Sequence, residues 1–308
     1  MTKVNENDIY SDEIDLKILI LEVWEKKFFI IIVATIFALV GAVYAFQQPN
    51  YYKSEATLAF NTSSNGSALS GQLGGIAALA GVNLSGGGSN ENEIIIEILK
   101  SRQFLSKFIS KYDLLAMLMA SEGWDPSSGQ LIYDESLYDS IDKNWTVNEE
   151  GGKQNRPSLL DSVNLFTDQL NVSVDSLSGL VKLSFEFYSP ELAKEIVVSL
   201  VEEINKEIKR RDIEEATLSI DYLTNQIAQT KALNLQTMFY GLLEEQTKTL
   251  MLANVRPEYA FKIIDPAIVP ERKSKPSRPL IVIVFTVLGG MLALVIAIFM
   301  YIFKGSDE

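Results

Sequence analysis

The sequence predicts an α+β protein in which two transmembrane helices flank one domain that contains a small mixed or antiparallel sheet and a long helical hairpin. Residues 28–46 and 280–303 are apolar runs without a charged residue. Each is close to the length of about 20 residues that crosses a bilayer core. Between the runs, alternating apolar and polar residues predict strands. Residues 190–253 contain proline only at their first position and a single glycine, which is typical of long helices.

The composition excludes several classes of function. The chain of 308 residues contains no cysteine and no histidine. Zinc sites and histidine-based acid–base catalysis would therefore need other residue types, and nearly all common hydrolase constellations are excluded. The net charge of −13 argues against binding to nucleic acid, because phosphates repel an acidic protein. We expect no catalytic residue, no cofactor and no metal site.

The basic residues around the two apolar runs predict the orientation. Lys26 and Lys27 precede the first run and Lys304 follows the second, which favours both termini inside. Four basic residues just before the second run oppose this orientation: Arg272, Lys273, Lys275 and Arg278. Because charge bias is weak for long translocated loops and the first span usually dominates, we favour both termini inside.

The first run also has the features of a signal peptide, with Val43-Tyr44-Ala45 resembling a cleavage site. It is longer than a usual signal sequence, however, and about 27 residues with several acids precede it. We therefore favour an uncleaved anchor.

The N-terminal third alternates between helical and extended patterns. Asp12–Lys27 predicts a short interfacial helix before the membrane, and the alternation in Tyr52–Phe60 predicts a strand after it. Residues 61–90 are rich in Gly, Ser and Ala, and form either a short apolar helix or a flexible loop. Apolar residues return at helical spacing in Glu93–Leu115.

Residues 122–156 form an acidic stretch that also contains aromatic residues. Aromatic rings among acids could stack on sugar rings and accept hydrogen bonds from hydroxyl groups. Alternatively, the stretch is a loop fastened to the domain by its own aromatics, and this is the interpretation that we favour. The aromatic residues are Trp124, Tyr133, Tyr138 and Trp145.

A helix, a β-hairpin and a capped helix follow in order. We expect a helix at 158–169, strands at 170–175 and 180–187, and a turn at 176–179. In the second strand, one face is apolar and the other polar. Ser189 is suited to the N-cap of the next helix, and Pro190 to its first position.

A geometric argument predicts that residues 190–253 form two helices. A single helix of about 64 residues would be roughly 96 Å long. The remaining residues before the second span could return that distance only if almost fully extended, yet 261–265 resembles a strand of the sheet. We therefore expect a helical hairpin that turns within 230–236. Two coiled-coil seams agree with this arrangement: Ile213, Ala216, Ile220, Leu223, Ile227 and Phe239, Leu243, Gln246, Leu250.

Small residues mark one face of each apolar run and allow helices to approach closely. The two sets are Ala34, Ala38, Ala42 and Gly289, Ala293, Ala297.

Several stretches together resemble one family. The most specific is Ile264–Ala267, Pro270 and Pro276–Leu280, which lead into an apolar run that contains Gly289-Gly290. Others are Asp12–Leu16, Leu99–Arg102 with Phe104-Leu105, residues 73–81, Ser189–Ala193 and Glu203–Asn205. Over nearly its whole length the chain resembles the chain-length determinant (Wzz) proteins, polysaccharide co-polymerases without a kinase domain. It departs from them at Leu294, where a further glycine often lies, and in its shorter helical segment.

The resemblance implies a non-enzymatic regulator of the length of O-antigen or a related lipid-linked glycan. Its implied partners are other copies of the chain in a homo-oligomeric ring, a Wzy-type polymerase, the lipid-linked glycan and membrane lipid. The implied location is the bacterial inner membrane, with a cytoplasmic segment (1–27), a span (28–46), a periplasmic domain (47–279, hairpin at about 190–253), a span (280–303) and a cytoplasmic tail (304–308). The implied motif and assembly residues are Pro266, Pro270, Pro276, Arg278, Pro279, Gly289 and Gly290.

Three other functions are weighed against this one. The first is a membrane subunit for capsule or exopolysaccharide that works with a separate tyrosine kinase, because the tail after Phe303 is too short for a kinase. The second is a glycan-acting enzyme with a carboxylate pair, but no spacing singles out such a pair. The third is a receptor for a periplasmic ligand.

Overall fold

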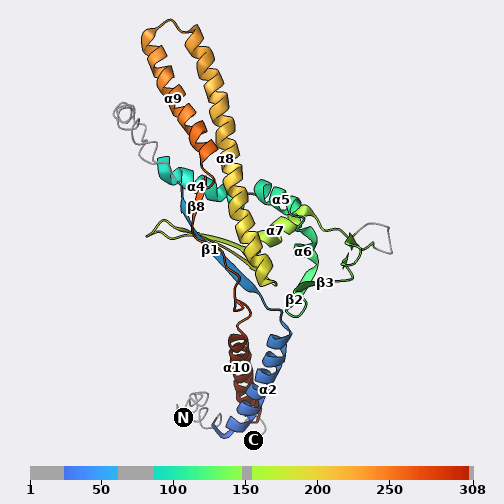
Figure 1. Ribbon diagram of the computed structural model, residues 1–308. Helices are drawn as coiled ribbons and strands as arrows, with labels where there is room; N and C mark the ends of the chain where they lie inside the picture. The colour runs from blue at the N-terminus through green and yellow to red at the C-terminus, as the bar shows by residue number, and fades with distance from the viewer. Residues whose placement is uncertain (1–23, 62–86, 148–154, 305–308) are drawn as a thin grey trace, which may run out of the picture. The chain divides into compact units, whose positions relative to one another are not determined.

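The computed structural model describes residues 24–61, 87–147 and 155–304. The chain divides into two compact units, one formed by the residues up to Pro49 and from Lys275 onward, the other by Asn50–Ser274 (Figure 1). Most of the expected interfacial helix and of the glycine-rich segment at 61–90 lie outside the described residues.

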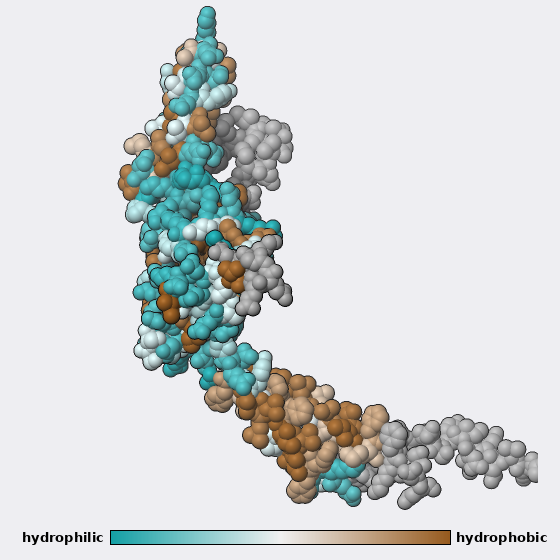
Figure 2. All heavy atoms as spheres, turned by 90° about the vertical axis from the view of Figure 1, so that its right-hand side faces the viewer, coloured by the Kyte–Doolittle hydropathy of each residue, from teal (hydrophilic) through white to brown (hydrophobic). Residues whose placement is uncertain are grey.

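The first unit is a pair of helices, α2 (Lys27–Gln47) and α10 (Arg278–Lys304). Both are long and apolar enough to cross a membrane. They pack antiparallel, since Lys26 Nζ lies 3.4 Å from the Ala297 carbonyl near the end of α10, and the Arg278 guanidinium lies over the Phe46 ring near the end of α2. The face of the helix pair that Figure 2 shows is mostly hydrophobic, which suits contact with lipid.

The second unit is built on a four-stranded antiparallel sheet in the order β6-β7-β1-β8. Strand β1 pairs with β7 from Tyr52↔Phe187 to Leu58↔Val181, and with the edge strand β8 on its other side. The predicted β-hairpin is present, with Gly179 at a φ of +69° in its turn, a conformation that favours glycine. The strands are β1 (Tyr52–Phe60), β6 (Leu170–Val174), β7 (Val181–Phe187) and β8 (Phe261–Asp265).

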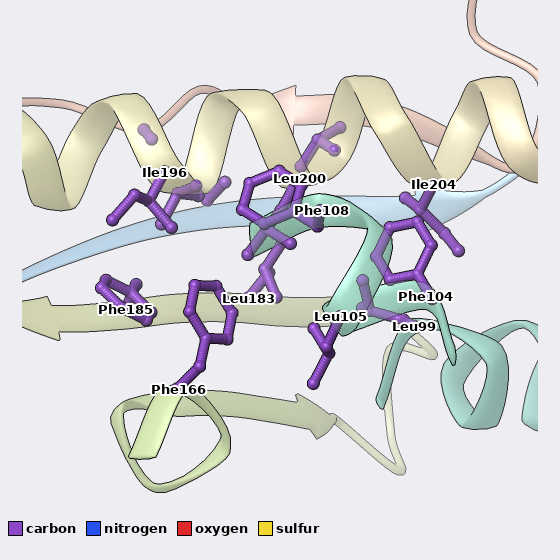
Figure 3. Packing of buried hydrophobic residues seen from close by; sticks show 14 of the residues in the cluster. Leu99, Phe104, Leu105, Phe108, Phe166, Leu183, Phe185, Ile196, Leu200 and Ile204 are labelled. Carbon is purple, nitrogen blue, oxygen red and sulfur yellow. The ribbon is translucent and has the colours of Figure 1, made fainter. Parts of the chain in front are cut away.

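Helix α8 (Pro190–Gln229) covers one face of this sheet. The apolar residues Val181, Leu183, Phe185 and Phe187 of β7 are fully buried, as expected. On the other face Lys182 is exposed and Glu186 partly buried, but Ser184 is buried as well. Phe166 of α7 (Leu159–Gln169) and Phe108 of α5 (Arg102–Lys111) complete the core beside α8 (Figure 3). The ring centroids of Phe166 and Phe185 lie 4.7 Å apart.

The long helical segment is a hairpin, as predicted. Helix α8 ends at Gln229, α9 (Leu233–Val255) runs back beside it, and the turn at 230–232 falls within the expected interval. Ser189 Oγ accepts a hydrogen bond from the Leu192 amide, and Pro190 occupies the first turn, so the expected cap is confirmed.

The region of helical spacing between 93 and 115 contains breaks. Ser101 adopts an extended conformation, and its hydroxyl caps α5 by accepting from the Phe104 amide. Small elements follow before α7. Helix α4 (Gly87–Lys100) precedes the break at Ser101, and the small elements after α5 are α6 (Leu115–Ala120), β2 (Ser121–Asp125), β3 (Gln130–Tyr133), β4 (Tyr138–Asp139) and β5 (Asn144–Trp145).

Candidate functional site

The two membrane-type helices interlock through reciprocal glycine–phenylalanine contacts. On α10, a Cβ placed on Gly289 would lie 2.5 Å from the Cβ of Phe37 in α2. On α2, a Cβ placed on Gly41 would lie 2.6 Å from the Cβ of Phe285 in α10. Each helix therefore carries a phenylalanine and a glycine four residues apart, and each glycine receives the other helix's ring. Any larger residue at either glycine would force the helices apart.

The two adjacent glycines of α10 have different surroundings. Gly289 is buried against Phe37, whereas no atom lies within 4 Å of a Cβ placed on Gly290. Ala293 and Ala297 continue the buried face below Gly289, as the predicted spacing indicates. The structure thus assigns close packing to Gly289 and leaves the Gly290 side of the helix open.

The buried small residues of α2 are not the predicted alanines. Gly41 and Ala45 are fully buried, whereas Ala34, Ala38 and Ala42 are only partly buried. Because Phe37 packs on Gly289 and Gly41 packs on Phe285, the side of α2 that carries Phe37 and Gly41 faces α10. Ala42 lies next to that side and is only partly buried. Sequence reasoning missed Gly41, although its signal was available as the single glycine within the first apolar run.

The residues before the second span begin the helix α10. Arg278 and Pro279 are its first two residues, and proline is tolerated there because the first helical amides have no partner inside the helix. The Arg278 guanidinium lies 4.8 Å from the ring centroid of Phe46. Pro276 follows Lys275 through a cis peptide bond and is partly buried.

Pro266 and Pro270 belong to the other unit, where the chain returns along β1. Ala267 is buried, and the buried Ser54 hydroxyl of β1 donates to the Ile268 carbonyl at 2.8 Å. Further along, the Ser274 amide donates to the Tyr51 carbonyl at 2.7 Å. Pro266 is exposed and Pro270 is partly buried. The predicted motif residues are therefore divided between the two units.

Asn205 joins α8 to the start of β8. Its Oδ1 accepts from the amides of Ala260 and Phe261 at 2.7 and 2.8 Å, and its Nδ2 donates to the Phe261 carbonyl at 3.1 Å. The residue is 6% exposed. In the sequence, Asn205 belongs to a stretch that resembles the family (Glu203–Asn205), but no role was predicted for it. Its signal is a polar residue one position after Ile204 on the buried face of an amphipathic helix.

The aromatic residues of the acidic stretch contact one another and the domain. The ring centroids of Tyr133 and Tyr138 lie 5.4 Å apart, and those of Tyr138 and Trp145 lie 5.2 Å apart. Trp124 packs edge-on against Tyr52 of β1. This arrangement favours the interpretation of the stretch as a loop that its own aromatics fasten to the domain.

Two carboxylates of this region, Asp125 and Asp134, accept hydrogen bonds within local turns of the backbone. The Ser127 amide and hydroxyl, together with the Ser128 hydroxyl, donate to the Asp125 carboxylate and hold its pKa at about 2. Hydrogen bonds from the Ser136 hydroxyl and amide likewise lower the pKa of Asp134. Within the described part of the chain, no three acidic side chains gather as a metal site would require.

Two protein families match this chain. Residues 12–112 match the chain length determinant protein, Wzz. The chain therefore carries a chain length determinant (Wzz) domain in its N-terminal third. Residues 224–301 match a second family, GNVR, named as a G-rich domain on tyrosine kinases.

Two solved structures resemble this chain. One, described as a full-length bacterial polysaccharide co-polymerase, has 13% identity and a TM-score of 0.39, and the match covers 94% of this chain and 99% of that one. The other, a fragment of WzzB, polysaccharide co-polymerase from Salmonella Typhimurium, has 12% identity and a TM-score of 0.26, with 73% and 100% covered. A comparison with curated proteins gives no match.

The interlocking contacts join the two segments that match these families. Phe37 and Gly41 lie in the Wzz match, and Phe285 and Gly289 lie in the GNVR match. The two matches, far apart in sequence, therefore meet in one helix pair.

Proposed function

We propose that this protein is a non-enzymatic regulator of polysaccharide chain length, acting on the O-antigen of lipopolysaccharide. The observation that carries the proposal is the match of residues 12–112 to the chain length determinant protein. The protein acts as an oligomeric scaffold in the bacterial inner membrane, where it works with a Wzy-type polymerase and its lipid-linked glycan. It needs no cofactor, because its role is to hold partners and not to make or break bonds.

The proposed organisation has both termini in the cytoplasm and the central domain in the periplasm. Two antiparallel apolar helices support this arrangement, since they would hold a domain to one membrane at both its ends. The segments are those expected from the sequence: residues 1–27, 28–46, 47–279, 280–303 and 304–308.

Deletion of the gene tests the function. We expect lipopolysaccharide from the deletion strain to show an unregulated ladder of O-antigen lengths on a gel, with total synthesis retained. Expression of the intact chain should restore the modal length. A deletion strain with the normal modal lengths would overturn the proposal.

The motif residues Pro266, Pro270, Pro276, Arg278, Pro279, Gly289 and Gly290 are proposed to act in assembly, and the two glycines allow a matched test. Gly289→Leu should push α10 away from Phe37, because the new side chain collides with α2. The O-antigen ladder of this variant should then lack its modal length. Gly290→Leu adds the same atoms to an open position, so it should leave the helix pair intact and affect assembly only through contacts outside that pair. Equal, wild-type ladders from both variants would remove Gly289 from the proposed site.

The GNVR match favours a second candidate function. Its name connects residues 224–301 with tyrosine kinases, so the protein could serve capsule or exopolysaccharide production together with a separate kinase. In that case the deletion strain should lose capsule while its O-antigen ladder stays normal, and the phosphotyrosine content of the kinase should change.

A further inference from the structure

Two cavities lie side by side along α8, on the side covered by α5 and α6. The first, of about 230 Å³, is lined by Lys107 and Lys111 of α5 and by Glu203, Lys206, Glu207 and Arg210 of α8. The second, of about 260 Å³, lies nearer the start of α8, and its lining includes Tyr112, Tyr133, Glu195 and Ser199. Phe108 lines both cavities.

The two cavities lie in a row along a single face of α8, and the pair is called the groove below. Their lining residues on this helix recur at steps of three and four from Leu192 to Arg210, which places them on one face over about 27 Å. Tyr112 lines the second cavity and Glu203 the first, and the Tyr112 hydroxyl donates to Glu203 at 3.3 Å. Phe104 and Phe108 point from α5 toward α8 and form the apolar floor (Figure 3). A groove of this length suits an extended ligand.

One end of the groove is cationic. Lys111 and Lys206 share the Glu203 carboxylate at 2.7 and 3.0 Å, and Arg210 and Arg211 share Glu207 at 2.9 and 2.8 Å. Lys206 and Arg210 also contact Glu202 and Glu214, whose side chains are 58% and 64% exposed and so contribute little.

Lys107 adds a further positive charge at this end and has no carboxylate partner among the described residues. The cations therefore outnumber the carboxylates that line the cavity, in a protein whose net charge is −13.

The other end offers aromatic rings and hydrogen-bond acceptors. Tyr112 and Tyr133 are partly buried, so each presents an apolar ring and a polar hydroxyl. Asp113 and Glu195 are exposed carboxylates that can accept hydrogen bonds from hydroxyl groups, and Ser199 can donate or accept. A saccharide has the complementary surface, because its rings carry C–H faces and many hydroxyl donors.

We propose that this groove binds an oligosaccharide that carries an anionic group, with the sugar rings against Tyr112 and Tyr133 and the anionic group beside Lys107 and Lys206. The inference rests on the proposed function in that it names the class of glycan that the protein recognises. A carboxylate of a uronic acid and a phosphate substituent share the required charge, and both form charge-assisted hydrogen bonds with lysine and arginine.

Binding to the purified full-length protein in detergent tests the proposal. The probes are a galacturonate hexasaccharide, neutral maltohexaose and inorganic phosphate, measured by isothermal titration calorimetry. We expect the acidic hexasaccharide to bind more tightly than either of the others. No binding of the acidic hexasaccharide would overturn the proposal, as would equal binding of phosphate alone or of maltohexaose.

Two pairs of variants locate the site. Lys107→Glu should weaken binding of the acidic hexasaccharide about tenfold or more, while Lys209→Glu, which makes the same charge change on α8 outside the cavity, should not. Ser199→Phe should fill the second cavity and weaken binding, while Ser219→Phe, outside both cavities, should not. Equal effects of a variant and its control would overturn the assignment. If Lys107→Glu changes the size of the oligomer and leaves binding of the hexasaccharide unchanged, the proposal is overturned, and the groove is a contact surface for a second copy of the chain.

The glycan ladder separates this inference from the proposed function. If deletion of the gene changes the ladder but the hexasaccharide does not bind, the groove inference fails and the function stands. If the hexasaccharide binds as expected but deletion leaves the ladder normal, length control fails and the binding site stands.

Discussion

The two halves of α8 differ sharply although they form one continuous helix. The half that lies on the sheet buries a broad apolar face, whereas the half that extends into the hairpin buries only a narrow seam against α9. The buried residues of the first half are Pro190, Ala193, Ile196, Val197, Leu200, Val201, Ile204, Asn205 and Ile208, and those of the second are Ala216 and Leu223.

The difference follows from what each half packs against. A sheet with α5 and α7 beside it surrounds the first half, whereas one partner helix covers only a strip of the second. Apolar residues therefore remain exposed in the hairpin, among them Leu218, Tyr222, Leu233, Met238 and Tyr240. The first half should supply the stability of the domain, and the hairpin should depend more on helix propensity.

The largest expected effect separates the two halves directly. Leu200→Ala removes a fully buried side chain between α8 and the sheet and should lower the free energy of unfolding by about 2–5 kcal/mol. Leu223→Ala makes the same change in the hairpin, where the site can collapse, and should cost about 1–2 kcal/mol. Denaturant unfolding of the full chain in detergent measures both. Equal losses would show that the hairpin is packed as well as the base.

Asn205→Ala tests the polar contact that joins α8 to β8. The substitution leaves the amides of Ala260 and Phe261 buried without their acceptor, so we expect a loss of about 2–3 kcal/mol. The matched control, Asn225→Ala, changes an exposed asparagine of the hairpin half and should change stability by less than about 0.5 kcal/mol. A small effect at Asn205 would mean that apolar packing alone holds β8 in place.

Gly241→Ala should stabilise the hairpin. Gly241 lies inside α9 with nothing within 4 Å of a Cβ placed on it, so alanine adds helix propensity without a clash. We expect a gain of about 0.5–1 kcal/mol, seen as a higher midpoint of unfolding. If helix propensity does not limit the hairpin, the midpoint will stay unchanged.

The smallest expected effect is a dependence on pH at the junction of the two halves. Hydrogen bonds from Arg210 and Arg211 hold the pKa of Glu207 at about 2, below the value of about 4.3 that an unfolded glutamate has. Because the folded pKa is the lower one, the stabilisation is present above about pH 4.3 and is lost as the pH falls toward 2.

The difference in thermal stability between wild type and Glu207→Gln should therefore shrink from pH 6 to pH 2. A constant difference for Glu207→Gln would contradict the assigned ion pairs.

Much of the fold was predictable because its signals are local. The β-hairpin followed from alternation in 180–187, and the start of α8 followed from Ser189-Pro190-Glu191. The break at Ser101 was not predicted, since the apolar spacing continues across it and only the cap on α5 identifies it. Asn205 was not given a role, because its partners lie 55 and 56 residues away.

The candidate site shows the same division. The glycine pair of α10 was found from the sequence, but its two members looked equivalent there. The position of Phe37 on α2 distinguishes Gly289 from Gly290, and the position of Phe285 on α10 explains why Gly41 is buried in place of the predicted Ala42.

By itself, the sequence determined the two apolar spans, the α+β class and the helical hairpin, because each depends on the length or period of a continuous pattern. Only the tertiary structure decided which glycine receives a ring, which asparagine binds β8, and how the lysines of α5 meet the glutamates of α8. These features join residues far apart along the chain, and such contacts arise when the elements pack, so no local pattern encodes them.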